Sequence, residues 1–269
     1  MIAPQYTSPD GAIQLYHADA MDVLPHLPPA SIDAVITDPP YSSGGAFRGD
    51  RTPSTHYKYV QSGQKHYLPD FSGDNRDSRS FAYWCDVWLR LCRRVSRPGS
   101  PICVFSDWRQ LPTTTDVIQA AGWVWRGIVA WDKGGGVRPQ MGRFRAQCEY
   151  IVWGSNGPMP QRTDIGALPG TYTYPVLRKE KQHQTGKPTA LMQDVVRICP
   201  LDGTILDPFA GSASTAIGAI RQGRRFIGCE VDDGYFEIAV RRIESEIADR
   251  QQSCVPVPPQ SLCKALHNV

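Results

Sequence analysis

The sequence predicts a doubly wound α/β fold, in which a mostly parallel sheet is covered by helices on both faces. Runs that are apolar on both faces, such as residues 31–37 and 101–106, are typical of strands buried in a parallel sheet. These runs alternate with helical patterns along the chain. Residues 202–232 have the pattern strand, tight turn, helix and strand, which is a βαβ unit.

The length and composition favour one domain. A chain of 269 residues with 41% hydrophobic content has enough apolar material for one good-sized core. We expect this domain to span residues 1–248 and to lack a large separate recognition domain. The proline-rich end, residues 249–269, is expected to be a loosely ordered tail.

The first half of the chain predicts three strands and two helices. Residues 13–16 form a strand followed by a short helix, and residues 31–37 form the second strand. A helix starts at Phe81, because its apolar residues fall on one stripe that we assign to the core. Pro98-Gly99 ends this helix, and the buried strand 101–106 follows. The stripe consists of Phe81, Trp84, Trp88, Leu91 and Val95.

The second half predicts an antiparallel pair and then the βαβ unit. After a helix over 113–121, residues 123–131 and 148–154 read as two strands without a helix between them, which favours antiparallel pairing at one edge of the sheet. A helix over 189–199 precedes the βαβ unit, and a final helix ends near Ala248.

The turn after the strand of the βαβ unit is suited to a nucleoside ligand. The strand ends at Asp207, and Gly211 with Ser212 and Ser214 allows a ligand to approach the backbone at a helix start. Glu230, at the end of the next strand, is placed to accept hydrogen bonds from ribose hydroxyls. The spacing G-x-G-x-x-G is absent, so an adenosine-containing ligand without a pyrophosphate fits better than a dinucleotide.

A second unusual turn follows the strand 31–37. Its residues Asp38, Pro39, Pro40 and Tyr41 offer a carboxylate and carbonyl oxygens, because proline has no N–H. A site made only of acceptors suits an exocyclic amino group, and the Tyr41 ring suits a stacked base. A Pro-Pro turn that only caps a strand has the same sequence.

Three loops have the composition of nucleic-acid contacts, namely residues 42–80, 133–147 and 154–182. Clustered positive charge among glycines and aromatic residues suits a phosphate backbone, although solvated loops share this composition. Tyr172 and Tyr174 are further candidates in the third loop. The proposed DNA-binding residues are Arg48, Arg138, Arg143, Arg145, Lys179 and Lys181.

Other features argue against metals and membranes. The eight cysteines never form a C-x-x-C pair, which makes a metal site and a disulfide framework unlikely and favours buried thiols. No apolar run is long enough to span a bilayer, and the N-terminus lacks a signal pattern. We expect a cytoplasmic protein of a bacterial or phage-infected host cell, with neither membrane nor metal as a partner.

Together, D-P-P-Y at 38–41 and D-P-F-A-G-S-A-S-T at 207–215 resemble the amino-methylating DNA methyltransferases that use S-adenosylmethionine. The catalytic tetrapeptide comes first, as in the β group, and the resemblance covers residues 12–247. It implies a Rossmann-like methyltransferase sheet. It also implies a cofactor site. Glu230 would lie at the ribose, Asp19 near the adenine and Lys187 near the methionine end. The methionine part would be lined by Asp207, Phe209, Gly211 and Ser212, with Pro208, Ser214 and Thr215 in the same turn.

The resemblance also implies base flipping followed by direct methyl transfer. The flipped base would stack on Tyr41 and donate its amino hydrogens to Asp38 and the Pro39 carbonyl. An acid at position 38 favours adenine N6 over cytosine N4. Ala213 stands where the family usually has glycine, and Gln184 and Gly186 replace its usual proline and glutamine.

Alternatives remain open for the acceptor and for activity itself. RNA or a protein amide would use a similar turn, although asparagine is then usual at position 38. A catalytically decayed DNA-binding protein would bind DNA without regard to the cofactor. The expected partner is double-stranded DNA, in a restriction-modification system or alone, and a homodimer is left open.

Overall fold

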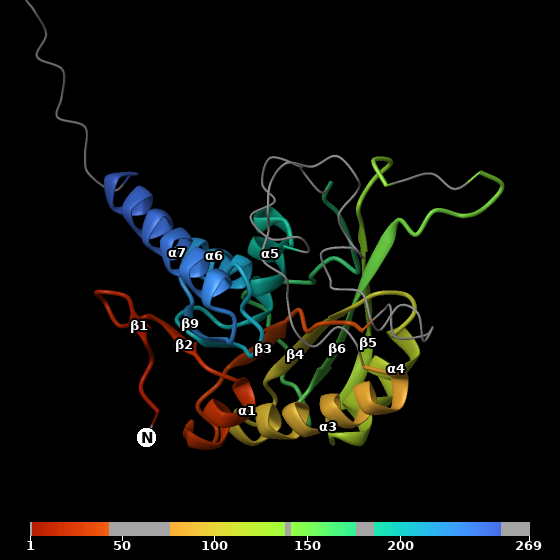
Figure 1. Cartoon of the computed structure of the whole chain (residues 1–269), viewed down its shortest axis with the longest axis horizontal. Helices are drawn as coiled ribbons and strands as arrows, with labels where there is room; N and C mark the ends of the chain where they lie inside the picture. Colours follow the sequence, from red (N-terminus) through yellow and green to blue (C-terminus); the bar gives the residue numbers. More distant parts are fainter. Residues whose placement is uncertain (1, 43–75, 138–140, 176–185, 254–269) are drawn as a thin grey trace, which may run out of the picture.

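The computed structural model describes residues 2–42, 76–137, 141–175 and 186–253. Its framework is a nine-stranded sheet in the order β1-β2-β9-β8-β3-β4-β6-β5-β7 (Figure 1). The strands are β1 (Tyr6–Thr7), β2 (Ile13–His17), β3 (Ala34–Thr37), β4 (Pro101–Ser106), β5 (Val124–Asp132), β6 (Cys148–Ser155), β7 (Thr171–Thr173), β8 (Thr204–Asp207) and β9 (Arg225–Glu230).

The centre of the sheet is parallel. β2 pairs with β9, β9 with β8, β8 with β3, and β3 with β4, all in the same direction. β6 runs against both β4 and β5, and β1 runs against β2. The carboxyl ends of β2, β3, β4, β8 and β9 therefore meet along one edge of the sheet, where ligands of such folds bind.

Helices cover both faces of the sheet (Figure 1). One layer contains α1 (Ala20–Val23), α3 (Ser78–Val95) and α4 (Leu111–Ala120), with the short 3₁₀ turn η1 (Leu24–His26) beside them. The opposite layer contains α5 (Thr189–Val195), α6 (Ser214–Arg221) and α7 (Asp233–Ser253), with η4 (Val196–Ile198) after α5. This three-layer arrangement is the doubly wound fold that the sequence predicts.

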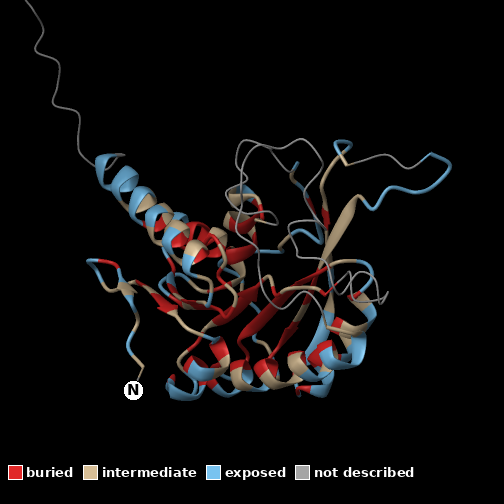
Figure 2. Cartoon of the chain, in the orientation of Figure 1, coloured by how far each residue is buried: buried red, intermediate tan, exposed pale blue. Residues whose placement is uncertain are grey.

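The core is divided into two clusters by the sheet, and the buried residues concentrate in its central strands (Figure 2). Side chains alternate between the clusters along a strand: Ala34 and Ile36 of β3 face the α5–α7 layer, and Val35 faces the α1–α4 layer. All four residues of β3 are buried. This double burial explains why the central strands are apolar on both faces.

The sequence misses three details of the fold. The β5–β6 pair is antiparallel as predicted, but the three-residue strand β7 lies outside β5, so the pair is not the edge of the sheet. Strand β1, only two residues long, is too short for a periodic signal. Helix α7 continues to Ser253 rather than ending near Ala248, so residues 249–253 are helical, whereas 254–269 lie outside the described residues.

The cysteines in the described ranges are free thiols, and all except Cys148 are buried. Cys254 and Cys263 lie outside these ranges. No helix in the described part of the chain is both long and apolar enough to cross a membrane. Within the same part, no three His, Cys, Asp or Glu side chains gather closely enough to hold a metal ion.

Candidate active site

One pocket, at the carboxyl ends of the parallel strands, contains both unusual turns. Every residue that the sequence assigns to the turn 38–41 and to the cofactor lines it, although most of the cofactor residues, from Lys187 onward, follow that turn by well over a hundred positions. They are Asp38, Pro39, Pro40, Tyr41, Asp19, Lys187, Asp207, Pro208, Phe209, Gly211, Ser212, Ser214, Thr215 and Glu230.

Asp207 holds the cofactor turn together. Its buried carboxylate accepts hydrogen bonds from the Thr37 hydroxyl at 2.7 Å, the Thr215 hydroxyl at 2.6 Å and the Phe209 backbone N–H at 3.1 Å. Burial raises the pKa of Asp207 to about 6, although these three donors oppose the shift. Asp207 therefore joins the end of β3 to the start of α6.

Glu230 ties the end of β9 to the same turn. Its Oε2 accepts a hydrogen bond from the Gly211 backbone N–H at 2.8 Å, and its Oε1 accepts from the N–H groups of Val231 and Asp232 at 3.0 and 2.9 Å. Burial raises the pKa of Glu230 against these donors. Because Oε2 has one bond in the structure, it retains a lone pair for a further donor.

Ala213 adopts a left-handed backbone conformation, which glycine adopts at lower cost than alanine. Its φ is +62° and its ψ is +33°, in the left-handed region, at the N-cap of α6. The alanine is fully buried, and the turn on either side keeps its hydrogen bonds, including Ala213 N–H to the Ala210 carbonyl at 2.8 Å. The departure from the family pattern is therefore accommodated locally by left-handed backbone.

Asp19 and an aromatic pair complete the pocket wall. Asp19 is the N-cap of α1, and its carboxylate accepts a hydrogen bond from Met21 N–H at 2.8 Å. The Phe209 ring lies 5.1 Å from the ring of Trp84. Trp84 is half-buried: it lines the pocket and also packs against the core cluster, as the helical stripe predicts. The stripe assignment is correct for Trp88, which is fully buried.

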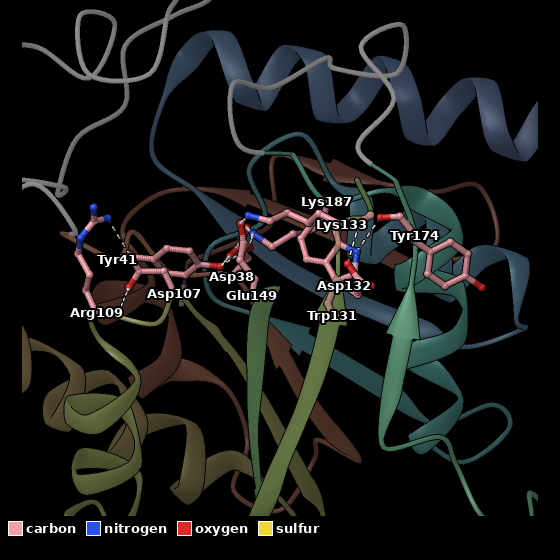
Figure 3. A network of polar contacts seen from close by, with 11 residues as sticks. Asp38, Tyr41, Asp107, Arg109, Trp131, Asp132, Lys133, Glu149, Tyr174 and Lys187 are labelled. Atoms are coloured by element: carbon pink, nitrogen blue, oxygen red, sulfur yellow. Dashed lines mark hydrogen bonds and ion pairs between the residues drawn. The ribbon is translucent and has the colours of Figure 1, made fainter. Parts of the chain in front are cut away.

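The catalytic turn is held by a buried ammonium group, as Figure 3 shows. Lys187 Nζ lies 2.5 Å from Asp38 Oδ2, and the Tyr41 hydroxyl donates a hydrogen bond to Asp38 Oδ1 at 2.6 Å. Lys187 is only 7% exposed, and its ammonium lies 5.2 Å from the centre of the Tyr41 ring. The sequence predicts a site made only of acceptors, and this is wrong because Lys187 and Tyr41 bring donors to Asp38.

Glu149 completes this network; it begins the segment E-x-x-x-W, which resembles a family section beside the target-base pocket, but the sequence assigns it no role of its own. Its Oε2 lies 3.3 Å from both Lys187 Nζ and the Tyr41 hydroxyl, and its Oε1 lies 3.1 Å from Lys133 Nζ. Glu149 is the only acid in the strand β6, whose other residues are apolar or uncharged. A lone carboxylate in a largely buried strand is the signal that could have identified it, because such a charge needs a buried partner.

The charges of the network balance, with two carboxylates facing two ammonium groups. Burial raises the pKa of Asp38, an effect that Lys187 opposes and Glu149 reinforces. Burial acts to lower the pKa of Lys187, but Asp38 and Glu149 outweigh it and the pKa is raised. Burial acts to raise the pKa of Glu149, but Lys187 and Lys133 outweigh it and the pKa is lowered. Lys187 and Glu149 are therefore both charged at neutral pH.

The expected DNA-contacting loops are described only in part. Arg143 and Arg145 are exposed on the connection between β5 and β6, which projects from the body of the protein in Figure 1. Phe144 between them is fully exposed, and Met141 is 94% exposed. Arg48, Arg138, Lys179 and Lys181 lie outside the described residues.

The two tyrosines of the third loop both make contacts within the protein. Tyr172 is in β7, is only 9% exposed and belongs to the core. The Tyr174 hydroxyl donates a hydrogen bond to Asp194 at 2.6 Å, and its carbonyl accepts one from the Trp131 indole at 2.9 Å. Tyr172 is corrected as a DNA contact, because pairing of β7 with β5 buries it, whereas Tyr174 is half-buried and its contact with DNA stays a prediction.

Comparisons with known proteins point to one family. A family model described as DNA methylase matches residues 32–241. The type II methyltransferase M.ScaI of Streptomyces caespitosus is 24% identical and M2.DpnII of Streptococcus pneumoniae is 26% identical. These alignments cover 90% and 86% of this chain, and 84% and 90% of the relatives.

Solved structures share the fold. The M1.HpyAVI–SAM complex superposes with a TM-score of 0.62 at 22% identity, covering 86% of this chain and 98% of that one. The PvuII DNA methyltransferase, described as cytosine-N4-specific, has a TM-score of 0.68 at 17% identity, covering 92% and 93%.

Proposed function

The chain belongs to the DNA methylase family, and on this premise we propose that it transfers a methyl group from S-adenosylmethionine to the N6 amino group of adenine in DNA. The observation that carries the proposal is the meeting of the Asp38 turn and the Asp207 turn in one pocket. The Asp38 turn offers a hydrogen-bond acceptor for the amino group of a base. The Asp207 turn offers the start of α6, and Glu230 beside it would accept a hydrogen bond from a ribose hydroxyl.

The pocket fits S-adenosylmethionine in charge and shape. The acids of its lining outnumber its two basic residues, Arg76 and Lys187, which suits a ligand with a sulfonium and an ammonium centre. The rings of Phe209 and Trp84 provide an apolar wall, and Gly211, at φ +52°, has no Cβ at the turn. The acidic residues of the lining are Asp19, Asp38, Asp207, Glu230 and Asp232.

Each part of the pocket is assigned one role. Glu230 would accept a hydrogen bond from the ribose, Asp19 would lie at the adenine end, and the turn 207–215 would hold the methionine end. When bound, the cofactor supplies an electrophilic methyl group. Asp38 would accept a hydrogen bond from the amino group of a flipped base and so orient its nitrogen lone pair, and Tyr41 would support the base plane.

The basic connection between β5 and β6 is proposed to contact the DNA backbone. Arg143 and Arg145 are exposed there, and both ends of the connection join the catalytic network through Lys133 and Glu149. Phosphate contacts by these arginines would position the duplex without reading its sequence. Arg48, Arg138, Lys179 and Lys181 are proposed for the same role from the sequence alone.

Cytosine N4 is the second candidate acceptor, because its amino group presents the same donors to Asp38 and because the similar PvuII structure is described as cytosine-N4-specific. The deciding experiment incubates methylation-free duplex DNA with the pure protein and S-adenosylmethionine and analyses the nucleosides by mass spectrometry. N6-methyladenine would support the proposal, and N4-methylcytosine would overturn the choice of base.

Two further outcomes address the remaining alternatives. If the cofactor binds but no methylated nucleoside forms, duplex DNA is not the methyl acceptor. RNA and protein are then tested as acceptors with labelled cofactor. If the cofactor does not bind and DNA binding weakens with salt regardless of its presence, the protein is a decayed DNA-binding member of the family.

A further inference from the structure

Both oxygens of Asp38 are already engaged by side chains of the protein. Lys187 Nζ lies 2.5 Å from Oδ2, and the Tyr41 hydroxyl lies 2.6 Å from Oδ1. Both contacts are short, and the first joins opposite charges, so both are strong hydrogen bonds. An amino group that arrives at this carboxylate must therefore compete with two internal donors.

Glu149 offers a second acceptor to the same two donors. A single oxygen, Oε2, lies 3.3 Å from Lys187 Nζ and 3.3 Å from the Tyr41 hydroxyl. The other oxygen, Oε1, is held by Lys133 at 3.1 Å, so the carboxylate is fixed in this orientation (Figure 3). Its side chain is 18% exposed, as is that of Lys133.

We propose that Glu149 is a positioning residue, which takes Lys187 and Tyr41 from Asp38 when the target amino group arrives. The inference rests on the proposed function. The base would bring one N–H to Asp38 and the other to the Pro39 carbonyl, and the two oxygens of Asp38 already accept from Lys187 and Tyr41, so the arriving donor has to share an oxygen with one of them. With Glu149 as a second acceptor, Asp38 is released for the base while no donor is left buried and unpaired.

The exchange would also change the chemistry of Asp38. Lys187 opposes the effect of burial on the pKa of this carboxyl group. If the ammonium moves toward Glu149, the pKa of Asp38 rises further. Asp38 then becomes a better acceptor for the proton that a methylated amino nitrogen must lose.

The first test is Glu149→Gln, which keeps the shape of the side chain but removes its charge. Methyl transfer is measured with tritiated S-adenosylmethionine at saturating duplex DNA. We expect kcat to fall about tenfold or more, because Lys187 stays on Asp38, with an unchanged cofactor Kd in calorimetry; Tm should also fall, because two largely buried ammonium groups lose a partner, so the assay is run well below the Tm of the variant. The matched control is Asp132→Asn, since Asp132 Oδ1 accepts hydrogen bonds from Gly134 and Gln147 that an asparagine can keep.

The second test removes the competing ammonium. If Glu149 acts by drawing Lys187 away, then Glu149→Gln combined with Lys187→Met should be faster than Glu149→Gln alone. If Glu149 only supports the fold, the losses of kcat should add, and the double variant should be no faster than Glu149→Gln. If Glu149→Gln fails to fold, Glu149→Asp is used instead. Aspartate keeps the charge, but its shorter side chain moves the carboxylate away from Lys187 and Tyr41, so the same loss of kcat is expected.

The outcomes separate this inference from the proposed function. A wild-type protein that methylates no DNA overturns both. An active wild type whose Glu149→Gln variant keeps kcat within about twofold overturns the inference alone. The inference alone is also overturned if the Glu149→Gln, Lys187→Met double variant has a lower kcat than Glu149→Gln.

Discussion

The hydroxyl of Thr37 donates a 2.7 Å hydrogen bond to the carboxylate of Asp207, and this bond joins the ends of two neighbouring strands from opposite halves of the chain. Thr37 immediately precedes the catalytic turn, and Asp207 begins the cofactor turn. This hydrogen bond therefore fixes the two turns relative to each other. It lies at the base of the pocket and does not involve Asp38.

Asp207→Ala is expected to weaken both folding and cofactor binding. The change leaves two threonine hydroxyls and the Phe209 N–H without their acceptor, and we expect a loss of about 3 kcal/mol in the free energy of unfolding. Urea denaturation and calorimetry with S-adenosylmethionine measure the two effects. Asp116→Ala is the control, because Asp116 is exposed on α4. Equal stability of the two variants would contradict the role given to Asp207.

Asp207 also predicts a pH dependence of stability. Its folded pKa is about 6, against an ordinary value of 3.8, so the folded state keeps its proton where the unfolded state has lost it. The contribution of Asp207 is therefore most favourable below pH 4 and falls as the pH rises to about 6. The difference between the two pKa values corresponds to about 3 kcal/mol in the free energy of unfolding. Comparing the unfolding free energy of wild type and Asp207→Asn across this range should show a slope that the variant lacks.

Asp38→Ala is expected to abolish transfer while leaving cofactor affinity nearly intact. Asp38 is the acceptor that would orient the amino group, so its removal should lower kcat about a hundredfold or more. Methyl transfer to duplex DNA and calorimetry with the cofactor are measured in parallel. Near-normal turnover would show that the catalytic turn is assigned wrongly.

Arg143→Ala and Arg145→Ala are expected to weaken DNA binding similarly for all sequences. Each lost phosphate contact should reduce the slope of log K against log salt by about 1. Arg241→Ala is the control, because Arg241 is exposed on α7, away from the catalytic network. Binding isotherms at several salt concentrations give the slopes. An unchanged slope for both variants would exclude this connection from the DNA interface.

The buried thiols are expected to resist alkylation. Burial raises the pKa of Cys103 and Cys199 to about 12, so neither is a thiolate at pH 8. Iodoacetamide should leave both unmodified in the native protein and modify them after unfolding, as mass spectrometry of peptides can show. Methyl transfer should survive this treatment. Loss of activity together with modification of a buried cysteine would point instead to a cysteine nucleophile.

The parallel core of the fold could be predicted because each central strand is apolar on both faces. This pattern depends only on local sequence, and the strands β3, β4 and β8 are buried as expected. Strand β7 could not be predicted, because three residues have no measurable period and its partner, β5, lies about forty residues earlier. Tyr172 was misassigned for the same reason.

The candidate site could be predicted as two separate turns but not as one network. Asp38 and Asp207 are visible because prolines and small residues follow them directly. The contact between Lys187 and Asp38 joins residues that lie 149 positions apart, and Glu149 approaches both from a third element. Only the tertiary fold brings an ammonium group to a turn whose own residues offer acceptors.

The order of the sheet also constrains how the protein can be made. Strands β8 and β9, near the end of the described chain, lie between β2 and β3, which are near its start. A growing chain that has emerged only as far as β7 therefore has a gap two strands wide in the middle of its sheet. We expect the nascent chain to stay open until β9 leaves the ribosome, because these long-range pairings form late. The protein should therefore depend on chaperones during synthesis more than a fold whose strands pair in chain order.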